Sequence, residues 1–256
     1  MMSFNKVFSL INTNNKIRKI ITVFRIVLNI EKPYKKNYAL NSGERQIGTD
    51  IKEIRKDHVN RYNLAINLIN KFFNQTSNIN GMDIFCGNGY GSWLISNETG
   101  AFIDSIDGSK EAISCAKKYY GNKKIHYESK FFPFNIKKNY YDFVVSLESV
   151  EHIKNDKLFL KELYNSLKNN GILIISTPNM EKQNLTKNPN HFHYRHYYND
   201  EFISLIEEIG FNFIEMYGQD TYIMNEQGLI SGILEPDKME IKKDYNGQFS
   251  IFVLKK

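Results

Sequence analysis

The sequence predicts an α/β fold, in which a mostly parallel β-sheet carries helices on both faces. Short apolar runs alternate with helical stretches between residues 81 and 176, a pattern typical of parallel strands joined by right-handed crossovers. The 256 residues suffice for one such domain with additions but are few for two. Hydrophobic residues make up 41% and charged residues 24%, which is ordinary globular usage and excludes a disordered or collagen-like chain.

The elements are expected in the following order. Residues 1–42 form a basic, partly helical extension, and a helix over Ile51–Phe73 opens the domain of residues 43–256. Strands are then expected at Gly81–Phe85, Ala101–Asp107, Lys124–Tyr127, Tyr141–Leu147 and Gly171–Ser176, with helices at Gly89–Asn97, Ser109–Tyr119 and Asn155–Lys168. A last helix, Asp200–Ile209, ends at Gly210, and Phe211–Tyr217 with Gln248–Leu254 close the sheet as an antiparallel pair. Residues 218–247 are expected to form a loop-rich insertion.

The positive charge is concentrated in the N-terminal extension. Residues 1–40 contain eight Lys or Arg and one acid, Glu31, so with a net charge of +6 the other residues sum to about −1. A basic arm on a neutral body is not typical of nucleic-acid-binding proteins, and no nucleic acid partner is expected. Three interpretations of the arm stay open: a solvated extension, a contact with a second copy or a partner subunit, and a peripheral contact with a membrane surface.

Composition also indicates the compartment. The longest apolar stretch, Ile20–Ile30, is too short to span a membrane and contains Arg25. Two cysteines, Cys86 and Cys115, argue against a disulfide framework and fit a reducing environment. No secretory leader is visible at the N-terminus, so a cytoplasmic protein is expected.

The first predicted strand leads into a glycine-rich loop that a helix follows. The loop reads Asp83-Ile-Phe-Cys-Gly-Asn-Gly89-Tyr-Gly91. Glycines allow a sharp turn and the close approach of a ligand to the main chain. The G-x-G-x-G spacing differs from the G-x-G-x-x-G of dinucleotide binding, and the Asp83 carboxylate would repel a pyrophosphate. A carboxylate at this strand end suits a cationic ligand.

A second acid ends the next predicted strand. Asp107 stands about 20 residues past the loop, where a carboxylate can accept hydrogen bonds from both ribose hydroxyls. The alternative for Asp107 is a helix N-cap. The two acids and the loop together describe a nucleoside with a short positive tail and no phosphate, a description that S-adenosylmethionine matches.

Over roughly residues 43–217 the sequence resembles the class I S-adenosylmethionine-dependent methyltransferases. The stretches that carry the resemblance are Asp83-Ile-Phe-Cys-Gly-Asn-Gly, Ser105-Ile-Asp-Gly-Ser, Phe132-Pro-Phe with Tyr141-Asp-Phe-Val-Val-Ser, and Gly171-Ile-Leu-Ile-Ile-Ser-Thr-Pro-Asn. Gly43-Glu-Arg and His58-Val-Asn-Arg-Tyr62 are similar to a bacterial subgroup found with surface-polysaccharide genes. The resemblance implies a Rossmann-like, seven-stranded, mostly parallel sheet with a final antiparallel strand.

The resemblance also implies a set of residues around the cofactor. The methionine end would be lined by Asp83, Phe85, Gly87 and Gly89, with Cys86 beside the loop, Leu147 facing the amine and Tyr62 closing over the cofactor. The ribose would lie at Asp107 and Gly108, and the adenine at Ser129 and Lys130. The adenine stretch departs from the family, because Glu128 stands where an Asp is usual and Lys-Phe-Phe follows in place of acidic residues.

The residues after the fourth predicted strand bear on the atom that receives the methyl group. Ser146-Leu-Glu-Ser149 stands where base-modifying amino-methyltransferases carry Asn/Asp-Pro-Pro-aromatic, and no Pro-Cys nucleophile follows. A nucleobase amine and a cytosine carbon are therefore disfavoured. An oxygen acceptor that gives up its proton to a general base is left as the leading hypothesis.

The segment Glu148-Ser-Val-Glu151-His152 is a candidate metal site. If it is helical, positions i, i+3 and i+4 share one face and could hold Mg²⁺, Mn²⁺ or Fe²⁺. The pattern resembles that of small-RNA terminal-ribose and ubiquinone-pathway O-methyltransferases. The alternative is that His152 only packs beneath the loop.

A second cluster, His191-Phe-His193-Tyr-Arg195-His196, follows the fifth predicted strand. His193 is expected to complete the metal set with Glu148, Glu151 and His152, and His191 or His193 to act as the general base. Arg195 is expected either to pair with Glu201 or to meet a phosphate.

These observations predict an S-adenosylmethionine-dependent O-methyltransferase. Its expected acceptor is a sugar, a nucleotide-activated sugar or a phosphate- or phosphoramidate-type modification in capsule or other surface-polysaccharide biosynthesis. One alternative is methylation of a quinone-like or phenolic small molecule. Another is a non-catalytic S-adenosylmethionine-binding partner subunit, against which the intact Asp83, Gly87, Gly89 and Asp107 argue.

Overall fold

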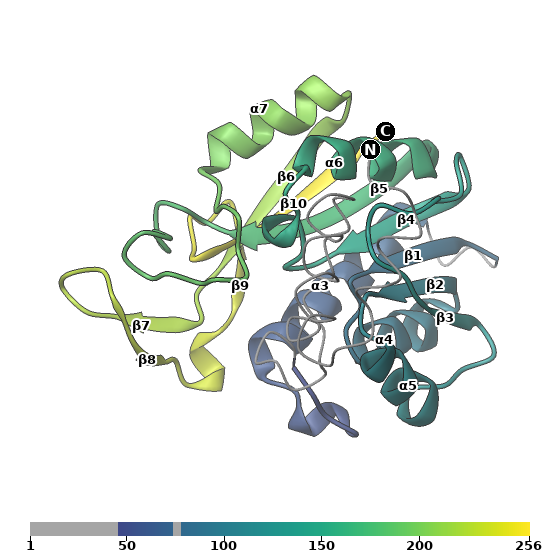
Figure 1. The fold of residues 1–256 in the computed structure, drawn as a ribbon, viewed down its shortest axis with the longest axis horizontal. Helices are drawn as coiled ribbons and strands as arrows, with labels where there is room; N and C mark the ends of the chain where they lie inside the picture. The colour runs from purple at the N-terminus through teal and green to yellow at the C-terminus, as the bar shows by residue number, and fades with distance from the viewer. Residues whose placement is uncertain (1–45, 74–77) are drawn as a thin grey trace, which may run out of the picture. The chain divides into compact units, whose positions relative to one another are not determined.

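The computed structural model describes residues 46–73 and 78–256, so the predicted basic extension of residues 1–42 lies outside the described residues. An eight-stranded sheet in the order β3-β2-β1-β4-β5-β10-β6-β9 forms the centre of the described chain (Figure 1). Its strands are β1 (Asn80–Ile84), β2 (Phe102–Asp107), β3 (Ile125–Ser129), β4 (Tyr141–Ser146), β5 (Leu167–Pro178), β6 (Asn212–Gln219), β9 (Ile241–Lys243) and β10 (Phe249–Lys255).

The pairing of the strands confirms a mostly parallel sheet with an antiparallel end. β1 to β5 pair in parallel, whereas β10 lies antiparallel between β5 and β6. The sheet has one strand more than predicted, because the three-residue β9 from the expected insertion pairs with β6. A strand of three residues is too short to leave an alternating pattern in the sequence.

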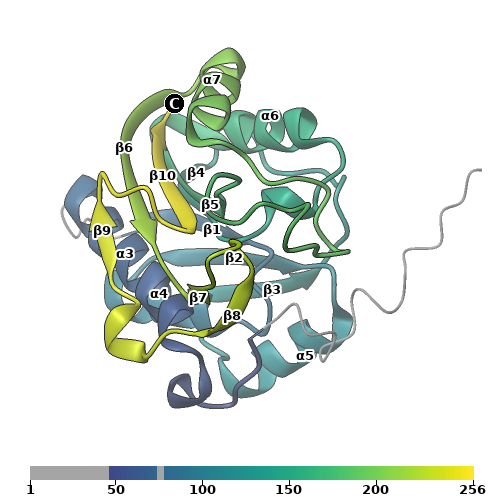
Figure 2. The same ribbon diagram turned by 90° about the vertical axis from the view of Figure 1, so that its left-hand side faces the viewer.

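Helices cover both faces of the sheet, as predicted. The helices are α3 (Lys56–Phe73), α4 (Tyr90–Thr99), α5 (Lys110–Tyr119), α6 (Asp156–Ser166) and α7 (Asn199–Ile209), with 3₁₀ turns η1 (Ile51–Glu53), η2 (Val150–His152) and η3 (Pro236–Lys238). α6 and α7 lie on one side of the sheet, and α3, α4 and α5 lie on the other (Figures 1 and 2). No helix in the described part of the chain is long and apolar enough to span a bilayer.

Alternating side chains of the central strands supply the two cores. On β5, Ile172 and Ile174 pack into the cluster beneath α3 and α4, whereas Leu173 and Ile175 pack into the cluster beneath α6 and α7. All four side chains are buried completely. Because successive side chains of a strand point to opposite faces, a strand covered on both sides has to be apolar throughout, which explains the continuous apolar runs in the sequence.

Residues 218–247, predicted as a loop-rich insertion, contain ordered elements. β7 (Tyr222–Met224) and β8 (Ile230–Ile233) form a separate two-stranded antiparallel sheet beside the main one (Figure 2). The hairpin is followed by η3 and by β9 at the sheet edge.

Candidate active site

The glycine loop between β1 and α4 is held against the end of β2. The amides of Phe85 and Cys86 donate to the Ile106 carbonyl at 2.7 and 3.1 Å. Phe85 has a φ of 64°, a strained conformation for a residue with a side chain and one that is concentrated at functional sites. Gly89 has a φ of 87°, and a Cβ there would lie 2.6 Å from the Ala116 Cβ, so only glycine fits.

Asp83 lies buried beneath this loop and organises two neighbouring side chains. The Tyr62 hydroxyl lies 3.3 Å from both carboxylate oxygens, and the Ser92 hydroxyl donates at 2.6 Å. Burial raises the pKa of Asp83 to about 7. The Tyr62 ring packs on Gly91 so closely that a Cβ there would lie 2.0 Å from it, which explains the third glycine of the loop.

Asp107 connects the loop to the start of the next helix. Its Oδ2 accepts from the Gly87 amide at 3.1 Å, and its Oδ1 accepts from the Ser109 amide at 2.7 Å. The N-cap of α5 is Ser109, which accepts from the Ala112 amide, so the N-cap alternative for Asp107 is wrong. The Asp107 carboxylate therefore stands beside the glycine loop at the carboxyl end of β2.

The residues predicted for the adenine end follow Asp107 along the same edge. The Lys130 amide donates to the Asp107 carbonyl at 3.0 Å, and the Ser129 hydroxyl donates to the Gly108 carbonyl at 3.3 Å. The Lys130 ammonium pairs with Glu128 at 2.8 Å.

A cavity of about 70 Å³ lies above the glycine loop. Its lining includes five of the residues predicted at the methionine end, namely Tyr62, Phe85, Cys86, Gly87 and Leu147. Asp83 and Gly89 are absent from this lining, because Asp83 lies beneath Tyr62 and Gly89 begins α4.

A second cavity, of about 540 Å³, adjoins the first. The two share the side chains of Gln46, His58, Arg61 and Glu148. The larger cavity is lined elsewhere by η2, by the segment of residues 178–196 and by the β7–β8 hairpin through Tyr222 and Ile230. The two cavities are therefore neighbours that are lined in part by the same side chains.

Buried charges from the start of α3 form part of the shared wall. The Arg61 side chain donates to Gln219 at 2.7 Å and stacks over the Phe249 ring at 4.1 Å. Asp57 accepts from Arg55 at 2.6 and 2.8 Å and lies 3.4 Å from Arg61. Burial opposes the ionisation of Asp57, but its partners hold its pKa far below the usual range. Burial and then Arg61 lower the pKa of His58 to about 3, so this imidazole is neutral near pH 7.

Glu148 does not join the predicted metal set. Its φ of 50° precedes η2, a single 3₁₀ turn rather than the α-helix that the i, i+3, i+4 argument requires. The carboxylate instead accepts from the Ser176 hydroxyl at 2.7 Å and lies 3.8 Å from the Arg61 guanidinium. Glu148 lines the larger cavity together with the other three predicted ligands but does not belong to the group whose ligand atoms lie close together. Burial raises the pKa of this carboxyl.

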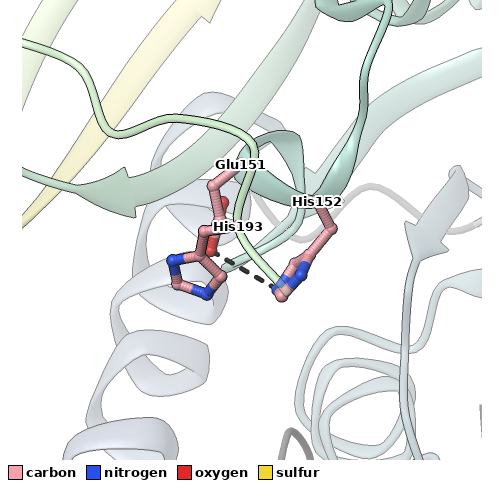
Figure 3. A group of neighbouring side chains, drawn as sticks. All are labelled: Glu151, His152 and His193. Atoms are coloured by element: carbon pink, nitrogen blue, oxygen red, sulfur yellow. Dashed lines mark ion pairs between the residues drawn. The ribbon is translucent and has the colours of Figure 1, made fainter. Parts of the chain in front are cut away.

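The other three predicted metal ligands do come together. Glu151, His152 and His193 each offer one ligand atom, and these atoms lie within 4.8 Å of one another (Figure 3). The segment of residues 191–196 is docked onto η2 by two bonds: the Tyr194 amide donates to the Glu151 carbonyl at 2.8 Å, and His152 Nδ1 lies 3.1 Å from the Phe192 carbonyl. Residues some 40 positions apart in the sequence thus share one wall of the larger cavity.

The sequence also predicted roles for His191, His193 and Arg195 in the segment of residues 191–196. Both predicted general bases, His191 and His193, line the larger cavity. Burial and then His152 and His196 lower the pKa of His193 to about 2, which leaves a neutral imidazole. Arg195 pairs with Asp156 at 2.9 Å, so the predicted pairing with Glu201 is wrong.

Sequence analysis missed several residues of the site. The larger cavity is lined by Arg55, His58, Arg61, Asn190 and His196, to none of which the sequence analysis gave a role there. Arg61 and His58 stand in the His58-Val-Asn-Arg-Tyr62 motif, which is the one signal that pointed to them.

Comparison with known proteins identifies the family of this chain. A family model described as a methyltransferase domain matches residues 75–228. The ubiquinone biosynthesis O-methyltransferase of Rickettsia bellii is 32% identical over 127 residues, which is 48% of this chain and 52% of that protein. The protein of the same name from Pelagibacter ubique is 36% identical over 107 residues, or 40% of this chain and 43% of that protein. The chain thus spans about half the length of the curated relatives it matches.

Solved structures support the fold. An S-adenosylmethionine-dependent methyltransferase from Thermotoga maritima superposes with a TM-score of 0.53 at 18% identity, covering 78% of this chain and 91% of that one. One from Mesorhizobium loti superposes with a TM-score of 0.56 at 12% identity, covering 77% and 98%. At these identities the likeness shows the shared fold alone.

Proposed function

The chain belongs to the methyltransferase family and is an S-adenosylmethionine-dependent enzyme, and on this premise we propose that it methylates an oxygen atom of a small molecule held in the larger cavity. The observation that carries the proposal is the wall of Gln46, His58, Arg61 and Glu148 that both cavities share. Because the two cavities adjoin at these side chains, an acceptor in the larger cavity would lie next to a methyl group presented from the smaller one. Such alignment is most of what an in-line displacement requires of a protein.

We infer the cofactor contacts from the same geometry. Asp107 accepts the ribose hydroxyls, while Gly108, Ser129 and Lys130 lie along the adenine. Tyr62, Phe85, Cys86, Gly87 and Leu147 surround the methionine end. Asp83 acts from beneath by holding Tyr62, and Gly89 lets the loop turn into α4.

We propose that Glu151, His152 and His193 bind a divalent cation. One carboxylate and two imidazoles suit Fe²⁺ or Mn²⁺ better than Mg²⁺, which prefers oxygen ligands alone. Ligand atoms about 2.1 Å from one cation lie about 3.0–4.2 Å apart, so a separation of 4.8 Å in this cluster has to shorten by about 0.6–1.8 Å when the cation binds. A bound cation would gather neighbouring acceptor oxygens and lower the pKa of the one that is methylated.

The proton of the acceptor hydroxyl needs a base. His193 is suited to ligation rather than to proton transfer, because its pKa, lowered to about 2 by burial and its histidine neighbours, makes the imidazole a weak base. His191 lines the larger cavity, and Glu148 stands on the wall shared by the two cavities. We therefore propose that one of these two groups accepts the proton. The variants His191→Ala and Glu148→Gln distinguish them, because only the variant that lacks the base should lose turnover while its affinity for the cofactor is unchanged.

The acceptor we favour is a phenolic molecule of the quinone-precursor type with neighbouring oxygens. The named relatives, at 32% and 36% identity, support this class, as does a cluster that could chelate two oxygens. A sugar or nucleotide-activated sugar in surface-polysaccharide biosynthesis is the second candidate. The polar lining of the larger cavity, with Arg55, Gln183 and Asn188, favours it.

The test is methyl transfer with the purified protein and S-adenosylmethionine. Catechols and phenols of the quinone-precursor type are compared with nucleotide sugars and oligosaccharides, each with Mn²⁺, with Fe²⁺ and with chelator. A methylated phenol supports the first acceptor class, and a methylated sugar supports the second. Tight binding of S-adenosylmethionine without transfer to either class would favour a non-catalytic partner subunit, and full activity in chelator would exclude the cation.

A further inference from the structure

A continuous chain of hydrogen bonds runs through the histidines behind the metal-ligand cluster. His196 Nδ1 lies 2.5 Å from the Gln183 carbonyl oxygen, and His196 Nε2 lies 2.7 Å from His193 Nδ1. His193 Nε2 lies 3.1 Å from the Asn190 side-chain nitrogen. The Asn190 side-chain oxygen accepts from the Phe192 amide at 3.0 Å. The chain therefore begins and ends at backbone groups.

The backbone groups determine the direction of every bond in this chain. A carbonyl oxygen only accepts, so His196 carries its proton on Nδ1 and its lone pair on Nε2. His193 must then donate from Nδ1, which leaves the lone pair on Nε2. A backbone amide only donates, so Asn190 turns its oxygen to Phe192 and its NH₂ to that lone pair. Both ends of the chain thus require the same tautomer of His193.

His152 is fixed by the same logic. Its Nδ1 faces the Phe192 carbonyl oxygen at 3.1 Å, which accepts the proton and leaves the lone pair on Nε2. His152 Nε2 lies 3.8 Å from a carboxylate oxygen of Glu151 (Figure 3). Two imidazole lone pairs and a carboxylate are the donors that a divalent cation needs.

We propose that His196 is a positioning residue that holds His193 in its metal-binding tautomer. The inference rests on the cation of the proposed function. His196 is suited to this role because it is mostly buried and bonded to Gln183, whose side chain donates to the Gln248 carbonyl beside β10 at 2.9 Å. The sheet itself therefore anchors the ring, and Asn190 holds the His193 lone pair at the position that the cation takes over.

The experiment is a titration of the purified full-length protein with Mn²⁺, followed by electron paramagnetic resonance. His196→Leu removes both bonds at similar volume, and we expect its Mn²⁺ affinity to fall about 10- to 100-fold, the range for partners that orient metal-ligating histidines. His196→Gln keeps one donor and one acceptor, and we expect affinity within about threefold of the parent protein. His126→Leu is the matched control, because His126 is an exposed histidine on β3 and should bind Mn²⁺ normally.

Two further measurements separate tautomer control from a loss of structure. S-adenosylmethionine affinity should be unchanged in His196→Leu, because the smaller cavity shares no residue with the segment of residues 183–196. In a His193→Ala background, His196→Leu should cause no further loss of Mn²⁺ affinity. Equal losses in His196→Leu and His196→Gln, or parent-like binding in His196→Leu, would overturn the proposal.

The outcome is also separable from that of the proposed function. A parent protein that binds no Mn²⁺ would overturn both the cation and the role of His196. A parent protein that binds Mn²⁺, loses it in His196→Leu and methylates no phenol or sugar would support the role of His196 and contradict the acceptor assignment.

Discussion

Replacement of Asp107 by alanine tests the cofactor site most directly. The carboxylate accepts one backbone amide on each oxygen, from Gly87 and Ser109. In the proposed cofactor site the two ribose hydroxyls donate to this same carboxylate. Hydrogen bonds to a charged group contribute about 1.5–3 kcal/mol each, so losing two weakens S-adenosylmethionine binding by about 3 kcal/mol or more. At 1.4 kcal/mol per tenfold, the dissociation constant should rise at least ~100-fold.

The same substitution should also lower stability. The Gly87 and Ser109 amides lose their acceptor in a mostly buried site, at about 1–3 kcal/mol each. At roughly 2–4 °C per kcal/mol for a domain of this size, the midpoint of thermal unfolding should fall by about 4–24 °C. Scanning calorimetry measures this shift, and isothermal titration at a temperature where the variant is folded measures the affinity.

Asp104 provides the matched control on the same strand. Its carboxylate accepts from Lys137 and from the Tyr141 hydroxyl at 2.7 Å, and it takes no bond from the glycine loop. Asp104→Ala should therefore leave S-adenosylmethionine affinity within about twofold of the parent value, because exposed ion pairs contribute at most about 1 kcal/mol and act locally. If Asp107→Ala binds the cofactor within about threefold of the parent protein, or if Asp104→Ala weakens binding equally, the assignment of Asp107 is wrong.

Three further predictions concern the loop and the cation. Burial raises the pKa of Asp83 to about 7. Between about pH 4 and 7 the folded protein therefore binds more protons than the unfolded protein. The free energy of unfolding should fall as the pH rises through this window, by at most ~4 kcal/mol. Urea unfolding at pH 5 and pH 8 should show this fall in the parent protein, and an equal fall in Asp83→Asn would contradict it. Gly91→Ala should destabilise the protein by about 1–3 kcal/mol because its Cβ would meet the Tyr62 ring, whereas Gly232→Ala, whose Cβ would have 3.4 Å of space, should change thermal unfolding little. Glu151→Gln should lower Mn²⁺ affinity at least ~100-fold, since it removes the anionic ligand of the three-residue cluster. The control Glu207→Gln changes an exposed carboxylate and should leave Mn²⁺ affinity unchanged. Parent-like Mn²⁺ binding in Glu151→Gln would exclude the site.

Local sequence patterns predicted the elements of this fold well. The boundaries of β2, β4, α5 and α7 lie within about two residues of the predicted ones, because strand burial, helix caps and a terminal glycine act over a few residues. The glycine loop was predicted for the same reason, since a sharp turn restricts which residue types fit. The extra strand β9 was not predicted, because a three-residue strand is stabilised only by its neighbour β6.

The candidate acceptor site depended on contacts that no local pattern contains. Glu148 contacts Ser176 and Arg61 rather than Glu151. Arg195 pairs with Asp156 rather than with Glu201. His193 met Glu151 only because residues 191–196 pack on η2.

The sequence by itself thus determined the α/β fold, the glycine loop and the acid at the end of β2, all of which follow from short-range periodicity and backbone geometry. The tertiary structure alone decided which polar side chains share a cavity wall and which tautomers they adopt. Those outcomes depend on hydrogen bonds between segments tens of residues apart, and such bonds form only once the strands and helices are packed.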